Sequence, residues 1–481
     1  MDNKSSENVI VQPVLVVDLD GTLIKSDLLI EGFFALLKVH FLYLFLVPFW
    51  LLKGKSHFKE QIFSRITVDP KLLPYHSSFL SFLKQQAESG RELILATAST
   101  EKAAHQVAEY LDIFHSVLAS TRTINLSGRK KLKAILEICK DNQFDYAGNA
   151  RVDLQIWSHA RKAILVNPNP GVEKNARKQG IVEAVFIEKK RGWPVFLKAV
   201  RPHQWLKNML IFVPLFTAHV WMDIAAISQS LLAFAAFCLC ASSVYLMNDL
   251  FDLPSDRVHP RKRFRPLASG DLQPLHGALA SIALLTAGLL VATIVSPLFA
   301  WVTAGYLAIT FAYSTQLKHY VLMDVIILAG LYTIRVIAGV VAIASEQSFW
   351  LLAFSMFIFL SLALVKRCAE LGTVYNAGDV AVKGRDYQVS DLDYLHSMGV
   401  ASGYISTMVL ALYINSEEVK ALYSNPQYLW MLCPLVLYWI SRVWLKTGRG
   451  EMHDDPLIFA IKDKGSLFVA ACIIFVTMFA V

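Results

Sequence analysis

The chain has 481 residues, 55% of them hydrophobic, and a formal net charge of +8 at pH 7. Its length allows two or three domains. The basic residues gather at the ends of apolar stretches and beside acidic motifs, which indicates an anionic membrane surface and argues against a nucleic-acid partner. The six cysteines form no Cys-x-x-Cys pair, and we expect them to be reduced packing residues.

Residues 1 to 190 carry charges throughout and are expected to form the first domain. The first ten residues are polar, and the first apolar run, Val14 to Val17, has only the length of a strand. No signal peptide is therefore expected, and the domain should stay in the cytosol.

Polar side chains follow apolar strands in this first domain. One predicted strand, 14–17, ends at Asp18 and Asp20, and a second, 93–96, ends at Thr97. Two further pieces follow in order: Lys131, and then Asn149 with Asp153. Strands separated by helical stretches indicate a Rossmann-like α/β fold with a parallel sheet, whose site lies beyond the strand ends. An isolated Asp-x-Asp-Gly-Thr is compatible with a simple turn, whereas four pieces in this order favour a site.

This set resembles the haloacid dehalogenase (HAD) superfamily of phosphotransferases over residues 13 to about 188. The resemblance implies that Asp18 is the nucleophile, which forms an aspartyl phosphate, and that Asp20 is the general acid and base. It further implies that Thr97 and Lys131 hold the phosphate group.

The same resemblance places Mg²⁺ among four residues: Asp18, Asp20, Asn149 and Asp153. Asn149 departs from the family pattern, which more often has an aspartate there. The lost carboxylate lowers the negative charge available to the metal, so either Asp153 suffices or the phosphatase activity is weak. An active phosphatase is the favoured interpretation, and a degenerate structural domain is the alternative.

A long apolar segment, Leu28 to Leu52, falls where a cap insertion would begin in the HAD superfamily. A full crossing of the bilayer there would separate Asp18 from Thr97. We therefore predict an interfacial helix or hairpin that docks the cap on the membrane. A buried cap core is the alternative.

Residues 191 to 204 form a predicted basic connector at the cytosolic surface, and residues 205 to 481 a predicted all-α membrane domain. The apolar segments of this domain are long enough to cross or nearly cross a hydrocarbon core. We expect about nine transmembrane helices, near residues 205–220, 228–248, 275–295, 297–315, 321–344, 348–366, 399–415, 428–445 and 466–481.

The orientation follows from the basic residues between these spans. With the front domain in the cytosol, the connections that face inward hold almost all of the Lys and Arg, and Lys420 is the exception outside. The acid-rich connections 248–256, 379–393 and 451–463 then lie on the cytosolic face of the plasma membrane. An odd number of spans puts Val481 outside.

One acidic motif follows the second predicted span. Its carboxylates, Asp249, Asp252 and Asp256, recur at intervals of three and four, which on a helix stacks them along one side. Mg²⁺ binds through a few carboxylates together with substrate phosphates, so the motif suits a diphosphate. Pro254 weakens the case for an unbroken helix, and a loop of solvated acids is the alternative.

A basic run follows the acidic motif. Its candidate phosphate contacts are Arg261, Lys262 and Arg265, because guanidinium forks suit phosphate oxygens. A membrane-surface patch is the alternative. Deeper in the domain, Asp324 and Arg335 are eleven residues apart and project from nearly the same helix face, which indicates a role in substrate or partner-helix contact, or a purely structural pair.

Residues 195 to 481 resemble the UbiA superfamily of intramembrane prenyltransferases. The resemblance rests on Asn-Asp-x-x-Asp-x-x-x-Asp from Asn248, on Arg-Pro-Leu-Ala-Ser-Gly at 265–270 and on Tyr313-Ser314. It implies that Asp249, Asp252 and Asp256 bind Mg²⁺ and a substrate diphosphate, with Asn248 assisting.

The second acidic motif of prenyl-transferring members is irregular here. The region instead contains Lys366 with Arg367, and then Arg385 with Asp386. These pairs resemble the motifs of the branch that includes decaprenyl-phosphate phosphoribosyltransferase. That branch joins the phosphoribose of phosphoribosyl diphosphate (PRPP) to a polyprenyl phosphate. The resemblance implies catalytic roles for the first two aspartates of the first motif, phosphate contacts for Lys366 and Arg367, and ribose or phosphate contacts for Arg385 and Asp386.

Together these expectations describe a bifunctional Mg²⁺-dependent membrane enzyme, whose front domain would remove the phosphate from the phosphoribosyl lipid. One alternative is a prenyltransferase that moves a prenyl group from a prenyl diphosphate to an aromatic or other acceptor. Another is a transporter or a non-catalytic scaffold. The sequence leaves open the lipid chain length and the oligomeric state, a homo-oligomer included.

Overall fold

The computed structural model describes residues 12–139, 143–188, 192–346, 348–376, 378, 385–452 and 455–481. The chain packs into two compact units, and each is discontinuous in sequence. The first contains residues 1–200 and 245–281, and the second contains residues 201–244 and 282–481. The predicted domain boundaries at 190 and 204 remain predictions, because this grouping adds a short internal segment to the front region.

The first unit is built on a parallel sheet of six strands in the order β3-β2-β1-β4-β5-β6. The strands are β1 (Val14–Val17), β2 (Leu93–Thr100), β3 (Ser116–Ser120), β4 (Phe144–Gly148), β5 (Lys162–Val166) and β6 (Val182–Phe186). The order reverses at β1, so loops after β1, β2 and β4 meet at one edge. The predicted Rossmann-like α/β fold is confirmed.

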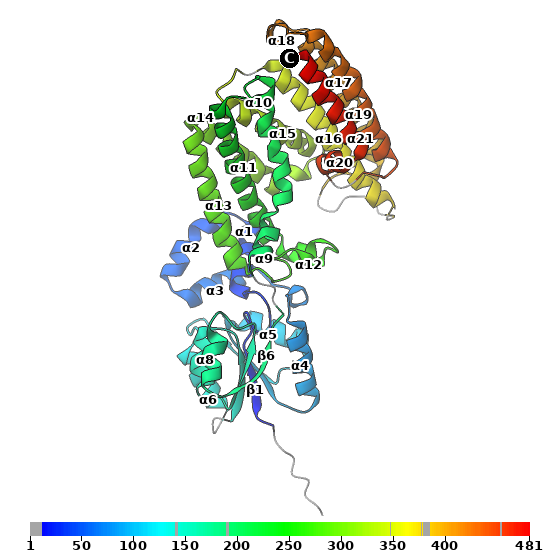
Figure 1. Ribbon diagram of the computed structural model, residues 1–481. Helices are drawn as coiled ribbons and strands as arrows, with labels where there is room; N and C mark the ends of the chain where they lie inside the picture. Colours follow the sequence, from blue (N-terminus) through cyan, green and yellow to red (C-terminus); the bar gives the residue numbers. More distant parts are fainter. Residues whose placement is uncertain are drawn as a thin grey trace, which may run out of the picture. The chain divides into compact units, whose positions relative to one another are not determined.

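Helices cover both faces of the sheet (Figure 1). Alternate side chains of β1 point to opposite faces, so Leu15 and Val17 belong to one apolar core and Val16 to the other. The helices around the sheet are α4 (Ser77–Glu88), α5 (Glu101–Leu111), α6 (Arg129–Ile138), α7 (Leu154–Trp157) and α8 (Val172–Lys178), with the short turns η1 (Pro70–Leu72) and η3 (Arg151–Asp153).

Between β1 and β2 lies a helical insertion, made of α1 (Leu28–Val39), α2 (Tyr43–Leu52) and α3 (Lys55–Phe63). Helix α1 begins at the side chain of Asp27, which caps the Ile30 N–H, and buries apolar residues against α3. In α2 most of the apolar residues are exposed, and Phe45 (65%) and Phe49 (63%) are examples. Two helices, α1 and α2, thus occupy the predicted segment, while docking of the segment on a membrane remains a prediction.

Helix α9 (Trp193–Val200) forms part of the predicted connector, whose residue 191 lies outside the described ranges. The internal segment of the first unit holds the end of α11 (Ile224–Phe251), then α12 (Leu253–Val258), η5 (Lys262–Phe264) and the start of α13 (Pro274–Val295). The helix breaks at Asp252, because Pro254 lies in the first turn of α12 and lacks an N–H group.

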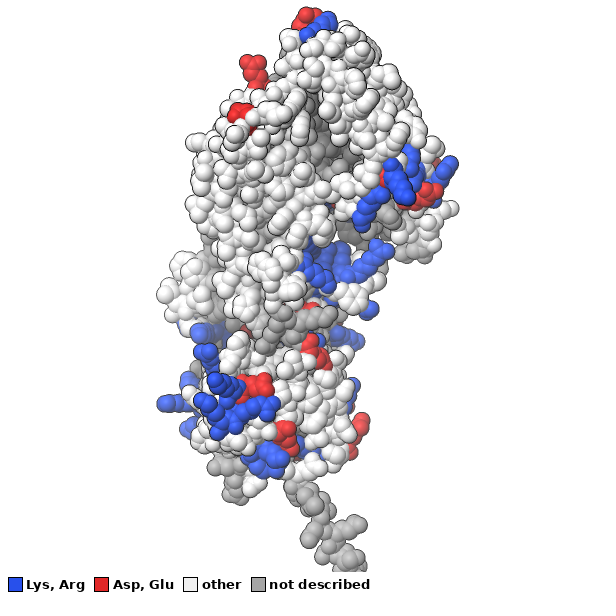
Figure 2. All heavy atoms as spheres, in the orientation of Figure 1, with Lys and Arg blue, Asp and Glu red and all other residues white. Residues whose placement is uncertain are grey.

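The second unit is all helical. Besides parts of α11 and α13, it contains η4 (Pro202–Phe212), α10 (Val213–Thr217), α14 (Pro297–Thr315), η6 (Leu317–His319), α15 (Met323–Ala342), α16 (Phe349–Asn376), η7 (Val389–Asp391), α17 (Leu392–Ile414), α18 (Glu417–Leu422), η8 (Pro426–Met431), α19 (Leu432–Gly448), α20 (Pro456–Lys462) and α21 (Lys464–Ala480). On the face shown in Figure 2, these helices present a broad uncharged surface.

Small residues let the helices of this unit approach closely. A Cβ atom on Gly399 of α17 would lie 2.1 Å from the ring of Trp444 in α19. The Trp444 N–H donates to the Ser361 hydroxyl, at 3.0 Å, and that hydroxyl donates to the Gly399 carbonyl, at 2.8 Å. Such contacts hold membrane helices together where no hydrophobic drive exists between them.

Seven helices in the described ranges are long and apolar enough to cross a membrane. They correspond to the second through eighth predicted spans. The predicted first span, 205–220, is instead a 3₁₀ helix followed by a short α-helix, with Pro202 and Pro214 at their starts. The predicted ninth span corresponds to α21, which has 17 residues. The sidedness of the membrane remains a prediction.

Candidate functional sites

The first candidate site lies at the carboxyl end of β1. The Asp18 N–H donates to the Ala147 carbonyl of β4, which holds the loop against the neighbouring strand. Gly21 follows with a φ of +77°, a conformation that favours glycine. A Cβ atom there would lie 2.3 Å from the Asn149 side chain. This close approach brings the β4 loop against the turn that carries Asp18 and Asp20.

Asp18 is buried and holds two partners. The Lys131 ammonium lies 2.6 Å from one carboxylate oxygen, and the Thr22 hydroxyl donates to the other at 3.1 Å. Burial alone would lower the pKa of Lys131, but the charges of Asp18 and Asp153 outweigh it and raise that pKa. The lysine therefore stays charged beside the predicted nucleophile, where it is able to attract a phosphate group.

Asp20 points to different partners from those of Asp18. It accepts hydrogen bonds from the Leu28 N–H at 2.8 Å, from the Ser99 hydroxyl at 2.7 Å and from the Thr97 hydroxyl at 3.4 Å. Burial, and then the nearby charge of Asp27, raise the pKa of Asp20 to about 7. A carboxyl group with such a pKa is suited to give and take protons near neutral pH.

Asn149 and Asp153 come from the loop after β4. One Asp153 oxygen accepts from the Asn149 and Ala150 N–H groups, at 3.0 and 2.8 Å, and the other accepts from the Tyr146 hydroxyl at 3.0 Å. Asp153 therefore fixes the loop that carries Asn149. Burial, followed by the charge of Asp18, raises the pKa of Asp153.

Two side chains at this site were missed in the sequence. Ser99 is the second polar residue after the predicted strand end, and it reaches Asp20. Lys59 of α3 is buried, and its ammonium lies 2.5 Å from the Ala98 carbonyl and 2.8 Å from the Asn125 side-chain oxygen. The insertion thus places a cation beside the end of β2 and the loop after β3, and no local motif signals this because Lys59 lies in an ordinary charged helix.

The second candidate site is the aspartate motif at the end of α11. Asp249 and Asp256 are buried, and both contact the same guanidinium nitrogen of Arg265, at 3.0 and 2.5 Å. Asp252 is turned to another partner, since its carboxylate lies 2.7 Å from the ammonium of Lys38 in α1. Asn248 lies half-buried one residue before Asp249. The break at Asp252 explains why the three carboxylates are not stacked on one helix side.

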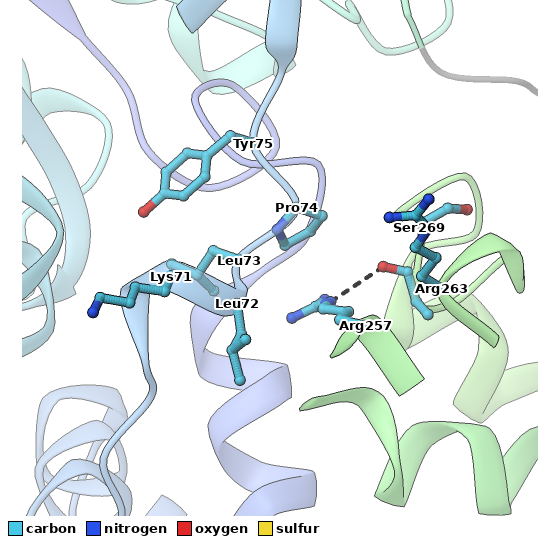
Figure 3. Close-up of a pocket in the computed structure, with 9 residues that line it drawn as sticks. Lys71, Leu72, Leu73, Pro74, Tyr75, Arg257, Arg263 and Ser269 are labelled. Atoms are coloured by element: carbon cyan, nitrogen blue, oxygen red, sulfur yellow. Dashed lines mark hydrogen bonds between the residues drawn. The ribbon is translucent and has the colours of Figure 1, made fainter. Parts of the chain in front are cut away.

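The basic run that follows is divided in its contacts. Arg265 reaches the motif, whereas Arg261 and Lys262 are exposed in the turn around η5. The Arg257 side chain is 8% exposed and forms two hydrogen bonds with Glu31 of α1, at 2.9 and 2.5 Å. Arg257 and Arg263 also line a cavity of about 260 Å³ (Figure 3). Its other lining residues are Lys71, Leu72, Leu73, Pro74, Tyr75, Ala268 and Ser269.

The polar side chains that line the cavity do not all point toward one place. Figure 3 shows Arg257 directed at the loop that carries Ser269, where its guanidinium donates to the Ala268 carbonyl at 3.1 Å. Lys71 and Tyr75 point away from Arg257 in the same view. We therefore regard it as a gap between the two loops that line it.

The second unit holds a charge cluster of its own. Asp324 of α15 is fully buried and lies 3.1 Å from the Arg367 guanidinium and 3.2 Å from that of Arg385. It also accepts a hydrogen bond from the Tyr387 hydroxyl. Arg367 further contacts Glu370 one helical turn away. The predicted Arg367 and Arg385 therefore meet at one carboxylate, whereas Asp386 is exposed.

Arg335 does not join this cluster. Its guanidinium donates to the Asn208 side-chain oxygen at 2.8 Å and to the Tyr306 hydroxyl at 3.1 Å. Asp324 and Arg335 share a helix face, as predicted, but each pairs with other helices, which supports contact with partner helices for both residues.

A further cation lies near the start of the second unit. The Lys207 ammonium is 2.6 Å from the Asp455 carboxylate. Burial alone would raise the pKa of Asp455, but the charge and hydrogen bond of Lys207 outweigh it, with a contribution from Lys366, and lower that pKa. Lys366 is thus electrostatically linked to this pair. The neighbouring Asp454 lies outside the described residues.

Both aspartate sites consist of the hard oxygen ligands that Mg²⁺ prefers. Within the described ranges, no three His, Cys, Asp or Glu side chains form a ready metal cluster. Mg²⁺ needs only one or two protein carboxylates beside waters and phosphates. At the motif, the Arg265 nitrogen that bridges Asp249 and Asp256 takes the place of such a cation, so this pair fits a metal ion.

The sequence was then compared with known proteins. Residues 209–460 match the UbiA prenyltransferase family, and this covers more than half of the 481 residues. The chain belongs to the UbiA prenyltransferase family. This UbiA region includes both the aspartate motif and the charge cluster around Asp324.

Three relatives extend the comparison. An uncharacterized protein, y4nM of Sinorhizobium fredii, is 37% identical over 463 residues, covering 95% of this chain and 89% of that protein. Nodulation protein NoeC of Azorhizobium caulinodans is 35% identical, and the match covers 56% of this chain and 88% of that protein. Decaprenyl-phosphate phosphoribosyltransferase of Mycolicibacterium smegmatis is 38% identical over 188 residues, which is 38% of this chain and 58% of that enzyme.

Proposed function

We propose that the UbiA region transfers phosphoribose from PRPP to a polyprenyl phosphate, and that the front domain then dephosphorylates the phosphoribosyl lipid. The observation that carries this proposal is the meeting of Asp249 and Asp256 on one cationic nitrogen at the end of a membrane helix. Two buried carboxylates in such a position suit a metal-bound diphosphate. The mycolicibacterial relative, a decaprenyl-phosphate phosphoribosyltransferase, supports transfer of phosphoribose to a polyprenyl phosphate, and we propose PRPP as the donor.

In the proposed transferase reaction, an oxygen of the lipid phosphate attacks the C1 carbon of ribose, and the bond from C1 to the diphosphate oxygen breaks. Asp249 and Asp256 would hold Mg²⁺, which when bound supplies positive charge to the departing diphosphate. Arg265 would contact the diphosphate oxygens. In the second unit, Arg367 and Arg385 would supply positive charge for a phosphate group of a substrate.

In the proposed phosphatase reaction, the Asp18 carboxylate attacks the phosphorus atom and forms an aspartyl phosphate. Lys131 balances the charge of the phosphate group, and Asp20 gives a proton to the departing ribose oxygen. Water then attacks the aspartyl phosphate while Asp20 accepts its proton. Asp18, Asn149 and Asp153 supply the oxygens that would hold Mg²⁺ there.

The acidic residues after α16 argue against the prenyl-transferring alternative. Asp386, Asp391 and Asp393 do not have the Asp-x-x-x-Asp spacing of the second motif in prenyl-transferring members. The Asp391 carboxylate accepts a hydrogen bond from the Gln388 N–H at 2.9 Å and caps the turn η7. Incubation with a radiolabelled prenyl diphosphate and aromatic acceptors tests this alternative, because label in an acceptor would establish it.

The full chain in lipid nanodiscs, given PRPP, a polyprenyl phosphate and Mg²⁺, should produce a ribosyl lipid that mass spectrometry of the extract detects. The Asp18→Asn variant should accumulate the phosphoribosyl lipid, and Asp249→Asn should produce neither lipid. Asp223→Asn is the matched control, because Asp223 caps the opposite end of α11 through the Ala225 N–H. Absence of any ribosylated lipid from the unaltered protein would refute the transferase proposal.

A further inference from the structure

Two charged residues of α1 contact the segment that carries the aspartate motif. Glu31 pairs with Arg257 and Lys38 pairs with Asp252, although the partners lie 226 and 214 residues apart in the chain. All four residues belong to the same compact unit. The ring of Phe34, also in α1, lies 5.9 Å from the ring of Phe251, which is the last residue of α11.

The pair of Glu31 and Arg257 is closed to water. The two side chains are 6% and 8% exposed, and the guanidinium forms two parallel hydrogen bonds with the carboxylate. The third guanidinium nitrogen of Arg257, Nε, donates to the Ala268 carbonyl at 3.1 Å. Arg257 lies next to Asp256 in sequence, so without Glu31 its positive charge would be available to the motif carboxylates.

The pair of Lys38 and Asp252 has a different character. Its side chains are 49% and 37% exposed, and the ammonium lies 2.7 Å from one carboxylate oxygen. Exposed ion pairs are weak and are readily exchanged for another cation. A divalent ion is therefore able to displace the Lys38 ammonium from the Asp252 carboxylate.

The loop after the motif is also fitted against the front domain. Gly270 has a φ of +78°, and a Cβ atom there would lie 2.5 Å from the Cβ of Lys25. The Lys198 ammonium of α9 lies 2.8 Å from the Phe264 carbonyl. The motif segment is thus also held by Lys25 of the front domain and by Lys198 of the connector.

We propose that Glu31 and Lys38 are positioning residues of the diphosphate site. Glu31 neutralises Arg257 and keeps that cation away from the motif, whereas Lys38 is a displaceable cation that competes with Mg²⁺ for Asp252. The inference rests on the proposed function in one respect, namely that the motif binds Mg²⁺ with a diphosphate. It makes the front domain a part of the transferase site.

The two residues should affect the metal requirement in opposite directions. Lys38→Met removes a competitor, so the Mg²⁺ concentration for half-maximal transfer should fall about 2- to 5-fold. Glu31→Gln frees the charge of Arg257 beside the motif, so this concentration should rise about tenfold or more. Lys38→Arg, which keeps the charge, and Lys53→Met, which changes an exposed lysine after α2, should match the unaltered protein.

Metal binding provides a second measurement that needs no turnover. Mn²⁺ serves as a paramagnetic substitute, and EPR of the full chain in the Asp18→Asn background gives its affinity. The binding that is lost on Asp249→Asn is assigned to the motif. Lys38→Met should tighten this binding and Glu31→Gln should weaken it.

The outcomes separate the inference from the proposed function. The inference is wrong if Lys38→Met and Glu31→Gln both leave the metal affinity unchanged. It is also wrong if both variants weaken metal binding, because general damage to the fold would do the same. It is also wrong if Asp249→Asn removes no bound Mn²⁺. If the opposite shifts occur but the unaltered protein makes no ribosylated lipid from PRPP, the proposed substrate is wrong while the positioning role stands.

Discussion

The two aspartate sites of this protein are assembled in different ways. The Asp18 site is built from strand ends, and its carboxylates are held mainly by backbone N–H groups, hydroxyl groups and one lysine. The motif at the end of α11 is held by the side chains of Arg265 and Lys38, and Lys38 lies 214 residues from its partner Asp252. The first geometry follows from the fold, whereas the second depends on charge balance.

This difference predicts how each site responds to substitution. Replacing a residue at the strand-end site should reduce the activity of that site without unfolding it, because the sheet holds the loops in place. Among the membrane helices, removal of one charge leaves its partner buried without compensation.

The largest expected effect is at the nucleophile. Asp18→Asn should lower phosphate release from the phosphoribosyl lipid on the order of 10⁴-fold, because no aspartyl phosphate forms. The transferase rate should be unchanged, as measured by lipid mass spectrometry with time. A parallel fall in the transferase rate would show that the two sites do not act independently.

The next largest effect concerns the cluster around Asp324. Arg367→Met should lower the free energy of unfolding by about 3–5 kcal/mol, because Asp324 would lose a buried partner. Thermal unfolding in detergent measures the change. Lys420→Met is the control, since its pair with Glu417 is exposed and should contribute about 1 kcal/mol or less. Equal shifts in the two variants would contradict the assigned role of burial.

A gain is expected at the strand-end site. Asn149→Asp adds a carboxylate beside Gly21, close to Asp18, and should tighten Mg²⁺ binding about tenfold. A Mg²⁺ titration of phosphatase activity measures the effect. An unchanged Mg²⁺ requirement would mean that the side chain at 149 is not a metal ligand.

The smallest effect is a pH dependence at the edge of the front domain. Glu188 accepts hydrogen bonds from the Ser77 N–H, at 3.1 Å, and from Ser78 at the start of α4, and it pairs with Lys25 at 3.1 Å. Although burial acts to raise its pKa, the hydrogen bonds to Ser78 and the contacts with Lys25 lower it to about 2. The stabilisation is present above pH 4.5 and is lost as the pH falls through about 2.

Glu188→Gln should therefore weaken the protection of α4 amides against hydrogen exchange by about 1 kcal/mol at pH 7. The difference from the unaltered protein should shrink between pH 4 and pH 2. A difference that stays constant over this range would contradict the assigned charge.

The sequence predicts the strand-end site well because its signals are local. Asp18 and Asp20 stand beside an apolar strand, and parallel strands bring Thr97 to the same edge. Hydropathy likewise predicts the long membrane helices. The contacts of Lys59 with Ala98 and Asn125, and of Glu31 with Arg257, could not be predicted, because each joins distant segments without a motif.

Pairing among the membrane helices was predictable only in part. The helical period places Asp324 and Arg335 on one helix face, but it does not predict which neighbouring helix supplies the partner of each residue. The proline in the motif indicated a break, yet the rotation of Asp252 toward Lys38 depends on a helix that lies far earlier in the chain.

The separation of Glu31 from Arg257 has a consequence for biosynthesis. At about 5–20 residues per second, a ribosome needs roughly 10–45 s to add the intervening stretch. During this interval the sheet is still incomplete or newly formed, and Glu31 of α1 does not yet have Arg257 as a partner. Helix α1 thus reaches its final environment only after the ribosome has also made α11, the first of the seven long apolar helices in the described ranges.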